Sequence, residues 1–202
     1  LNSLGCDILQ RASNDTYGSR IPGTDHVITG NQCLSNNNVG IGLIQPANRF
    51  IISNNICVAK DENLEEVLDM ASGLRRKEGI SVYNITSVNQ RVTDSHRGII
   101  TDNQVKNTRW SGIYLNANNI GNVQDNRGGF NGTVSGNRVD NTCNEVGPGQ
   151  SANLQGGIAV IATQGCVIAN NVITRVRGYG QFDPDTGSAW NAGIILSSEL
   201  GG

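Results

Sequence analysis

A short alternation of apolar and variable residues recurs along the whole chain. Six times a glycine is followed by an apolar residue, a variable residue and a second apolar residue, and these copies begin at Gly5, Gly40, Gly79, Gly112, Gly157 and Gly193. Alternation with a period of two is typical of a strand that buries one face. We therefore predict a short strand at each copy.

A second phrase lies between consecutive copies and is centred on an asparagine. Its five copies are centred on Asn31, Asn55, Asn103, Asn137 and Asn171. An apolar column lies three residues before the asparagine (Ile28, Ile52, Ile100, Val134, Ile168), and another lies two residues after it (Cys33, Cys57, Val105, Val139, Ile173). The odd separation places the two columns in different strands, so the asparagine stands at the corner between them.

The asparagines predict how that corner is closed. Asparagine tolerates the left-handed backbone conformation that a short corner requires, and its amide can bond the equivalent asparagine one repeat away. A stacked ladder of this kind leaves no buried amide without a partner. Each repeat therefore contributes three short strands and one rung of an asparagine ladder.

Stacked repeats of this kind predict an all-β solenoid with a continuous core. Because one repeat system runs through all 202 residues, we expect residues 1–202 to form a single domain of about five to six coils. The chain opens almost directly on a repeat strand, and its one methionine is Met70. We therefore expect it to be a segment of a longer polypeptide.

One segment departs from the repeat and predicts a helix over residues 61–78. Its apolar residues recur at helical spacing: Leu64, Val67, Leu68, Ala71 and Leu74. Asn63 and Glu66 are spaced as in a capping box, and basic residues follow late in the segment. We expect a short amphipathic helix that lies on the side of the solenoid.

Charge and composition exclude some classes of partner. The net charge is −2, and no basic run is interleaved with aromatic residues, which argues against nucleic acid. No apolar stretch approaches the roughly 18–20 residues that span a bilayer, so we expect no membrane insertion. Asp183 and Asp185 flank a proline in a segment that could seat calcium, but a turn is the commoner outcome, and we expect neither a metal nor a cofactor.

The five cysteines cannot all pair within the chain. Small buried thiols in core positions are the favoured interpretation, and they suit folding in a reducing cytoplasm. Cys33 and Cys57 occupy the same inward column one coil apart, so a disulfide between them remains open.

The three-strand repeat with its asparagine corner resembles the right-handed parallel β-helix superfamily. Pectate lyases, polygalacturonases, alginate epimerases and bacteriophage tailspikes share this architecture. The resemblance covers nearly the whole chain and specifies the fold rather than the activity. It implies that the glycine-apolar steps form the first sheet, with a carbohydrate groove along the outer face of that sheet. The chain is most similar to a tailspike or polysaccharide depolymerase, which implies a homo-trimer located at a virion tail or outside the cell.

That groove predicts a set of residues that bind a polysaccharide. Outward positions of the first sheet are Asp7, Gly42, Ser81, Tyr114, Ala159 and Ile195, and they continue to Tyr83 and Asn116. Aromatic rings pack on the C–H faces of sugars, while amide and guanidinium groups bond the hydroxyls. The candidate substrate-binding residues are Tyr83, Tyr114, Asn116, Arg109, Trp110, Arg177 and Trp190. A contact between subunits is an equally open role for the tyrosine pair.

Acidic residues in the long excursions are the candidate catalysts. They are Asp125, Glu145, Asp183 and Asp185. Hydrolysis needs two carboxyl groups about 5–5.5 Å apart for retention or about 6.5–9.5 Å apart for inversion. A lyase needs a base and a cation that stabilises the developing negative charge. The paired acids of polygalacturonases and the Arg-x-Pro-x-x-Arg of pectate lyases are absent, so the sequence does not choose between the two reactions. A non-catalytic carbohydrate-binding adhesin and a structural shaft are the alternatives.

If the chain is a depolymerase, Asp183→Asn and Glu145→Gln should each lower turnover of the polysaccharide while the fold stays unchanged. Both substitutions remove a carboxyl group and keep the size of the side chain. Turnover is measured by release of oligosaccharides, and the fold is checked by circular dichroism. Full activity in both variants would remove these two residues from the catalytic candidates.

Overall fold

The computed structural model describes the following residues of the chain: 6–11, 25–34, 39–44, 49–60, 63–66, 78–83, 96–116, 130–143, 156–161, 165–177 and 192–197. These residues form strands, turns and corners, and none of them is helical. The described part of the protein is therefore all-β.

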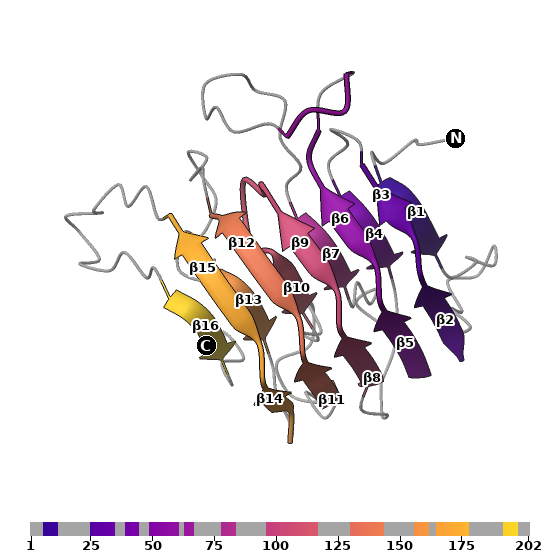
Figure 1. Ribbon diagram of the computed structural model, residues 1–202. Helices are drawn as coiled ribbons and strands as arrows, with labels where there is room; N and C mark the ends of the chain where they lie inside the picture. The colour runs from indigo at the N-terminus through magenta and orange to yellow at the C-terminus, as the bar shows by residue number, and fades with distance from the viewer. Residues whose placement is uncertain are drawn as a thin grey trace, which may run out of the picture.

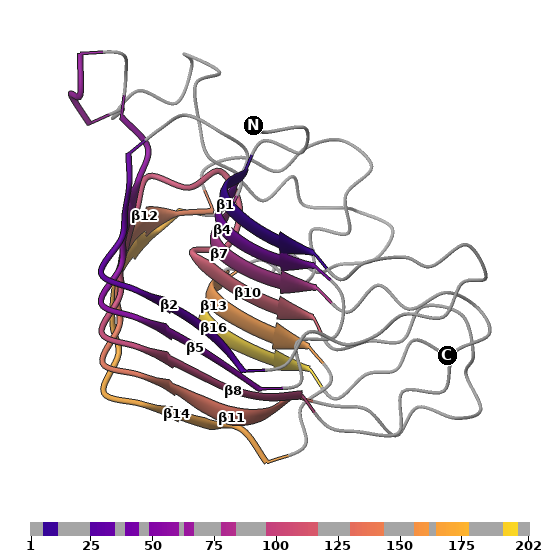
Figure 2. The ribbon, with the colours of Figure 1, turned by 90° about the vertical axis from the view of Figure 1, so that its right-hand side faces the viewer.

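The strands belong to three parallel sheets that lie around a shared interior (Figures 1 and 2). The first sheet contains, in spatial order, β1 (Cys6–Arg11), β4 (Val39–Ile44), β7 (Glu78–Tyr83), β10 (Ile113–Asn116), β13 (Gly156–Ile161) and β16 (Ala192–Ser197). The second contains β2 (His26–Thr29), β5 (Arg49–Ser53), β8 (His96–Thr101), β11 (Phe130–Ser135) and β14 (Val167–Ala169). The third contains β3 (Gln32–Cys33), β6 (Ile56–Val58), β9 (Gln104–Lys106), β12 (Arg138–Thr142) and β15 (Val172–Val176).

The chain visits the three sheets in strict rotation, because every strand pairs with the strand three places further along. The predicted strands at the glycine-apolar steps are the first sheet, and the two strands around each asparagine belong to the second and third sheets. This order is compatible with a parallel β-helix, and we call each set of three successive strands a coil.

Like residues stack in columns to form the core. In the first sheet Ile41, Ile80, Ile113 and Ile158 follow one another in register, and all four are fully buried. The two predicted columns also face the interior, and they end in the half-buried Ile168 and Ile173. Burial of each aliphatic side chain contributes about 1.5–3 kcal/mol, so the repetition of one apolar choice from coil to coil stabilises the whole stack.

The predicted asparagine ladder is present at the corner between the second and third sheets. In Asn55, Nδ2 donates to Oδ1 of Asn103 at 3.0 Å, and the same oxygen accepts the backbone N–H of Asn55 at 3.0 Å. The same pair of bonds joins Asn31 to Asn55, Asn103 to Asn137, and Asn137 to Asn171. From Asn55 onward, each amide also donates to a carbonyl of the preceding coil, as Asn103 does to Ile52 at 2.9 Å. The three inner asparagines are buried and fully bonded.

The left-handed residue at this corner precedes the ladder asparagine, which corrects the sequence prediction. The residues with positive φ are Gly30, Asn54, Asp102, Gly136 and Asn170, with φ between 54° and 70°. The ladder asparagines themselves do not have positive φ. One residue therefore turns the chain, and the next residue turns its amide inward to bond the stack.

The glycines that begin the first-sheet strands leave space for side chains of the third sheet. A Cβ placed on Gly112 would overlap a methyl group of Val139 and would lie 2.9 Å from the carbonyl oxygen of Gly157. Gly79 faces Val105 in the same way, and Gly157 faces Ile173. At these three positions glycine is thus required by close approach, both to the third sheet of the same coil and to the next strand of the first sheet.

A second polar corner, between the third and first sheets, escaped the sequence analysis. Asn107 and Asn141 both have positive φ, and Nδ2 of Asn141 donates to Oδ1 of Asn107 at 2.8 Å. Both residues lie four positions after a ladder asparagine, so the spacing N-x-x-x-N was the available signal. This second ladder is shorter because Ala59 and Arg175 occupy the equivalent positions of the flanking coils.

The predicted helix over residues 61–78 is wrong where the structure describes that range. Glu66 forms an isolated antiparallel bridge with Lys60, and Leu64 has a φ of 65° and is 60% exposed. Glu78 already belongs to β7, and residues 67–77 lie outside the described part. Glu66 also pairs with Lys106 of β9 at 3.3 Å, so tertiary contacts override the local helical spacing.

The cysteines of the core are reduced. Cys33 and Cys57 are neighbours in register on β3 and β6 and are both buried, and no disulfide joins them. Burial raises the pKa of Cys143 to about 12 and that of Cys166 to about 11, so both stay protonated at neutral pH. Among the described residues, no helix has the length and apolar character needed to cross a bilayer.

Two adjacent asparagines provide a matched test of the ladder. Asn55→Ala should lower the free energy of unfolding by about 2–4 kcal/mol, because half-buried groups of Asn31 and Ile28 and the buried Oδ1 of Asn103 each lose hydrogen bonds. Asn54→Gly should change it by less than about 0.5 kcal/mol, because glycine adopts the left-handed conformation of this exposed residue. Urea unfolding followed by circular dichroism measures both, and equal losses would contradict the separate roles of the two residues.

Candidate binding surface

Several predicted site residues lie outside the part of the chain that the structure describes. They are the candidate catalysts Asp125, Glu145, Asp183 and Asp185, together with Trp190. Their roles therefore stay predictions.

The structure brings three predicted substrate-binding residues onto neighbouring strands of the first sheet. Tyr83 of β7 is in register with Asn116 of β10, and Tyr114 lies two residues before Asn116 on the same strand. Tyr114 is half-buried, and the side chains of Tyr83 and Asn116 are not among those described. The pairing of β7 with β10 confirms the prediction that the two tyrosines lie on neighbouring strands.

The outer face of the first sheet is more buried than the sequence suggested. Ser81 and Ala159 are fully buried, and Gly42 is buried as well, although all three were expected to face an open groove. The alternation of the strand fixes which way a residue faces, but it does not determine what covers that face. The described part of this face does not form the open surface that the resemblance implied.

Three other predicted residues, Arg109, Trp110 and Arg177, lie at the corner between the third sheet and the first. The carbonyl oxygen of Trp110 accepts the backbone N–H of Cys143 at 2.9 Å, and Thr142 accepts that of Arg177 at 2.9 Å. Arg109 and Trp110 are half-buried, whereas Arg177 is exposed. Trp110 and Arg177 therefore lie along one corner, on different coils of the stack.

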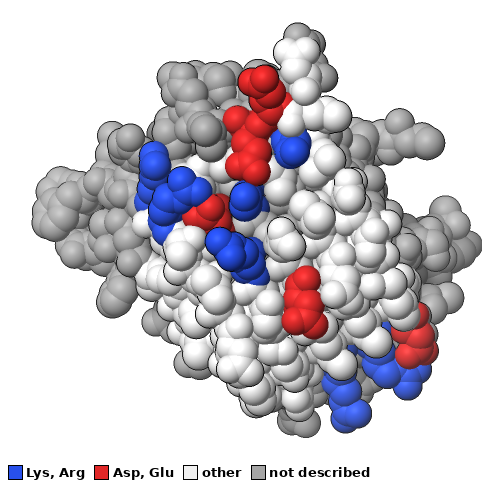
Figure 3. All heavy atoms as spheres, viewed as in Figure 1, with Lys and Arg blue, Asp and Glu red and all other residues white. Residues whose placement is uncertain are grey.

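Charged side chains gather on the outer face of the third sheet (Figure 3). Asp140 of β12 accepts hydrogen bonds from Nε of Arg175 at 2.8 Å and from the hydroxyl of Thr174 at 2.7 Å, and Arg175 also forms an ion pair with it. Lys106, in register with Asp140 on β9, pairs with Glu66 at 3.3 Å. The hydrogen bond from Arg175 is the main reason that the pKa of Asp140 is lowered to about 2. Because it stays ionised, Asp140 is a structural anion rather than a proton donor.

The outer face of the second sheet carries a hollow that we consider as a candidate binding site. Its cavity volume is about 410 Å³, and it is lined by residues of β2, β5, β8 and β11 together with Asp25: Asp25, His26, Val27, Arg49, Phe50, Ile51, Arg97, Gly98, Ile99, Asn131, Gly132 and Thr133. We call this hollow the second-sheet groove. It crosses four successive strands, so its long direction follows the stack of coils.

An exposed apolar column forms the floor of the second-sheet groove. Val27, Ile51, Ile99 and Thr133 are in register on adjacent strands, and Val167 of β14 continues the column. Val27 is 64% exposed, Ile51 39% and Ile99 44%. Large β-branched side chains stacked on an open sheet face are unusual for a monomer and indicate contact with a ligand or another surface.

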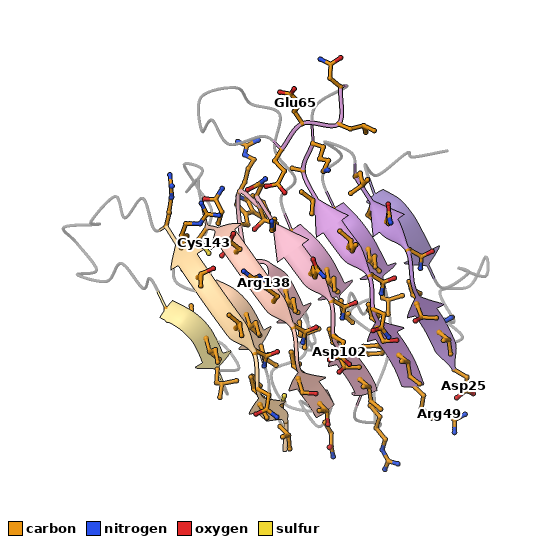
Figure 4. The ribbon with its side chains drawn as sticks, viewed as in Figure 1. Asp25, Arg49, Glu65, Asp102, Arg138 and Cys143 are labelled. Atoms are coloured by element: carbon orange, nitrogen blue, oxygen red, sulfur yellow. The ribbon has the colours of Figure 1, made fainter. Side chains whose placement is uncertain are left out.

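Polar and charged residues border the same floor. Arg49 and Arg97 are in register on β5 and β8, and Asn131 follows on β11. Arg49 forms an ion pair with Asp25 at 2.7 Å, and Figure 4 shows both residues at the end of the second sheet. On the other side of the floor, the hydroxyl of Ser53 donates to that of Thr29 at 3.1 Å. The groove therefore combines an apolar floor with hydrogen-bonding edges.

Pairs of adjacent apolar residues in the sequence were the available signal for this groove, but such pairs also occur in strands that are buried on both faces. Residues three and four positions before each ladder asparagine are both apolar in several repeats, as in Ile51-Ile52 and Ile99-Ile100. Such a run is typical of a parallel strand that is buried on both faces. The structure buries Ile52 and Ile100 fully but leaves Ile51 and Ile99 exposed.

Comparison with known proteins does not identify a relative for this chain. No protein-family profile matches it, and neither the curated proteins nor the solved structures contain a match. Within the described residues, no group of three or more His, Cys, Asp or Glu side chains is placed to hold a metal ion.

The acidity of Asp140 predicts a specific dependence of stability on pH. Its pKa lies at about 2 in the folded chain against an ordinary value of 3.8, so its stabilising effect is complete above 3.8 and is lost as pH falls through about 2. Near neutral pH, Asp140→Asn should therefore lower the free energy of unfolding, and the difference from wild type should shrink across that interval. Urea unfolding at a series of pH values measures it.

Arg175→Gln serves as the companion variant, because it removes the main cause of the lowered pKa. It should show the same loss of pH dependence as Asp140→Asn. A difference between wild type and Asp140→Asn that stays constant down to pH 2 would contradict the assignment.

Proposed function

We propose that this chain is a right-handed parallel β-helix, of the pectate-lyase-like kind, that binds and degrades a bacterial surface or acidic polysaccharide. The polymer lies in the second-sheet groove. The observation that carries this proposal is the shape of the groove, which follows the stacking direction across four strands. At roughly 4.8 Å between strands, four strands extend over about 14 Å, which suits a few linked sugar units better than one small molecule.

The chemistry of the groove suits a sugar chain. The C–H faces of sugar rings gain from contact with an apolar floor, here Val27, Ile51 and Ile99. Hydroxyl groups at the rim meet the amide of Asn131 and the hydroxyl of Thr133. A floor of stacked β-branched residues repeats in step with the coils, so successive sugars meet similar surroundings.

Residues other than those that line the groove catalyse cleavage of the polymer. Asp25 is the one carboxylate among the lining residues, and it is paired with Arg49. Hydrolysis by two carboxyl groups therefore needs Asp125, Glu145, Asp183 or Asp185, and elimination needs one of them beside a cation. We propose these residues as the catalytic set, with hydrolase and lyase both open.

The proposal includes a location at a virion tail or outside the cell, after folding in a reducing cytoplasm. The reduced Cys33 and Cys57, adjacent in the core, are consistent with folding under reducing conditions. Homo-trimerisation is part of the same proposal, because a trimer can cover or complete surfaces that one chain leaves open.

A structural shaft is the second candidate function, and the exposed apolar column favours it. Val27 and Val167 are 64% and 55% exposed, and an apolar column of this length would pack well between subunits. In that case the second-sheet face is an interface and the protein does not bind sugar there. Sedimentation of the full chain tests this candidate, since a stable monomer would contradict the shaft. Binding of a polysaccharide in the groove separates the two candidates, because the shaft buries that face between subunits.

The proposed function is tested with a panel of capsule, O-antigen and uronate polysaccharides. We expect the full chain to bind at least one polymer and to release fragments that mass spectrometry detects. Fragments that carry an added water indicate a hydrolase, and fragments with an unsaturated end indicate a lyase. Intact polymer without binding, across the panel, would contradict the proposal.

Two exposed valines provide the matched control for the site. Val27→Gln changes the floor of the groove, whereas Val172→Gln changes an equally apolar position on the outer face of the third sheet. We expect the first variant to lose most binding and the second to bind as the wild type does. Equal binding by both variants would place the polysaccharide on another face.

A further inference from the structure

We propose that the second-sheet groove selects an anionic glycan, and that Arg97 binds its carboxylate or sulfate groups while Asp25 competes for the neighbouring Arg49. This inference rests on the proposed function, because it assumes that the groove binds a glycan. It commits to an anionic polymer, which the proposed function leaves as one of two choices, and it names the residues that recognise the charge.

Two arginines lie side by side on adjacent strands of the groove, and a described carboxylate neutralises only one of them. Arg49 and Arg97 are in register on parallel strands and face the same side of the sheet, so their Cα atoms are roughly 4.8 Å apart. Like charges side by side on a sheet are unfavourable unless an anion lies close by. Asp25 neutralises Arg49, and within the described part of the chain no carboxylate pairs with Arg97. Among the described lining residues, the groove therefore has one positive charge in excess.

The surroundings of Arg97 make it suitable for an anion. Its side chain is exposed at the edge of the groove, and its neighbour on the next strand, Asn131, is neutral. A guanidinium group binds a planar carboxylate through two parallel hydrogen bonds, and it keeps its charge at every physiological pH. A uronate whose ring lies on Ile99 would thus carry its carboxylate toward Arg97.

Asp25 acts as an internal competitor for the second arginine. The ion pair of Asp25 and Arg49 is 2.7 Å long, but the two side chains are 62% and 63% exposed. Exposed pairs of this kind contribute little to stability, so a ligand carboxylate can replace Asp25 on Arg49 at small cost. Removal of the Asp25 charge should therefore strengthen binding of an anionic ligand, whereas removal of the Arg97 charge should weaken it.

The chain offers a control for the effect of net charge. Arg138 of β12 is an exposed arginine on the outer face of the third sheet, where Figure 4 shows it away from Asp25 and Arg49. Arg138→Gln changes the net charge as much as Arg97→Gln does, but it leaves the groove unaltered. A difference in affinity between these two variants therefore measures contacts in the groove and not long-range attraction by net charge.

The experiment measures binding of polygalacturonate, alginate and hyaluronan by the full chain, each beside its methyl-esterified form. We expect the acid form of at least one to bind, and esterification to weaken that binding. Arg97→Gln should weaken it at least about tenfold, Asp25→Asn should strengthen it about two- to fivefold, and Arg138→Gln should leave it unchanged. Binding should also weaken as salt is raised. All three residues are exposed, so thermal unfolding should be the same in every variant.

Each other result overturns the inference. Equal affinity for the acid and esterified forms would show that the groove does not recognise the charge of the ligand. A loss of affinity in Arg138→Gln as large as in Arg97→Gln would show the same. Binding of neutral polymers alone would reject the anionic ligand while it leaves the proposed function in place. Absence of binding to every polymer, together with an oligomer that Ile51→Lys dissociates, would reject both and would assign this face to a subunit interface.

Discussion

The buried asparagine ladder is the interaction on which the rest of the structure depends. Asn55, Asn103 and Asn137 bring polar amides into the interior, which is tolerable only because each amide bonds the neighbouring rung and a carbonyl of the preceding coil. A coil that shifts by one residue would leave several buried groups unbonded at once. The ladder therefore fixes the register of the second and third sheets, and with it the stacking of the apolar columns.

The register of the ladder does not depend on how many residues lie between one rung and the next. Successive rungs are 24, 48, 34 and 34 residues apart in the chain, yet all four make the same pair of hydrogen bonds. The cost of closing a flexible loop grows slowly, by about 0.6 kcal/mol for each doubling of its length. The coil of 48 residues is thus accommodated at little more cost than the coil of 24, and the number of residues between two rungs can change while the ladder stays the same.

The sequence predicted the features that repeat from coil to coil, and it missed the features that depend on a contact made in one place only. The Ile and Val columns and the ladder asparagines were predictable because each residue meets its own equivalent in the next coil. The helix predicted over 61–78 is wrong at residues 63–66, which the structure describes, because Glu66 pairs with Lys60 and with Lys106 of β9. The second-sheet groove was missed for a related reason: Ile51 and Ile52 look alike in sequence, and only the assembled sheet shows which one meets solvent.

The glycines of the first sheet have a consequence for how such a chain can change. Gly79 faces Val105, Gly112 faces Val139, and Gly157 faces Ile173, so the small residue and the large residue that fills its place always belong to the same coil. The steric match is therefore inherited as a unit when a coil is copied or removed. Duplication of one whole coil would therefore keep each glycine together with the side chain that fills its place, whereas an exchange that breaks within a coil would separate the matched pair.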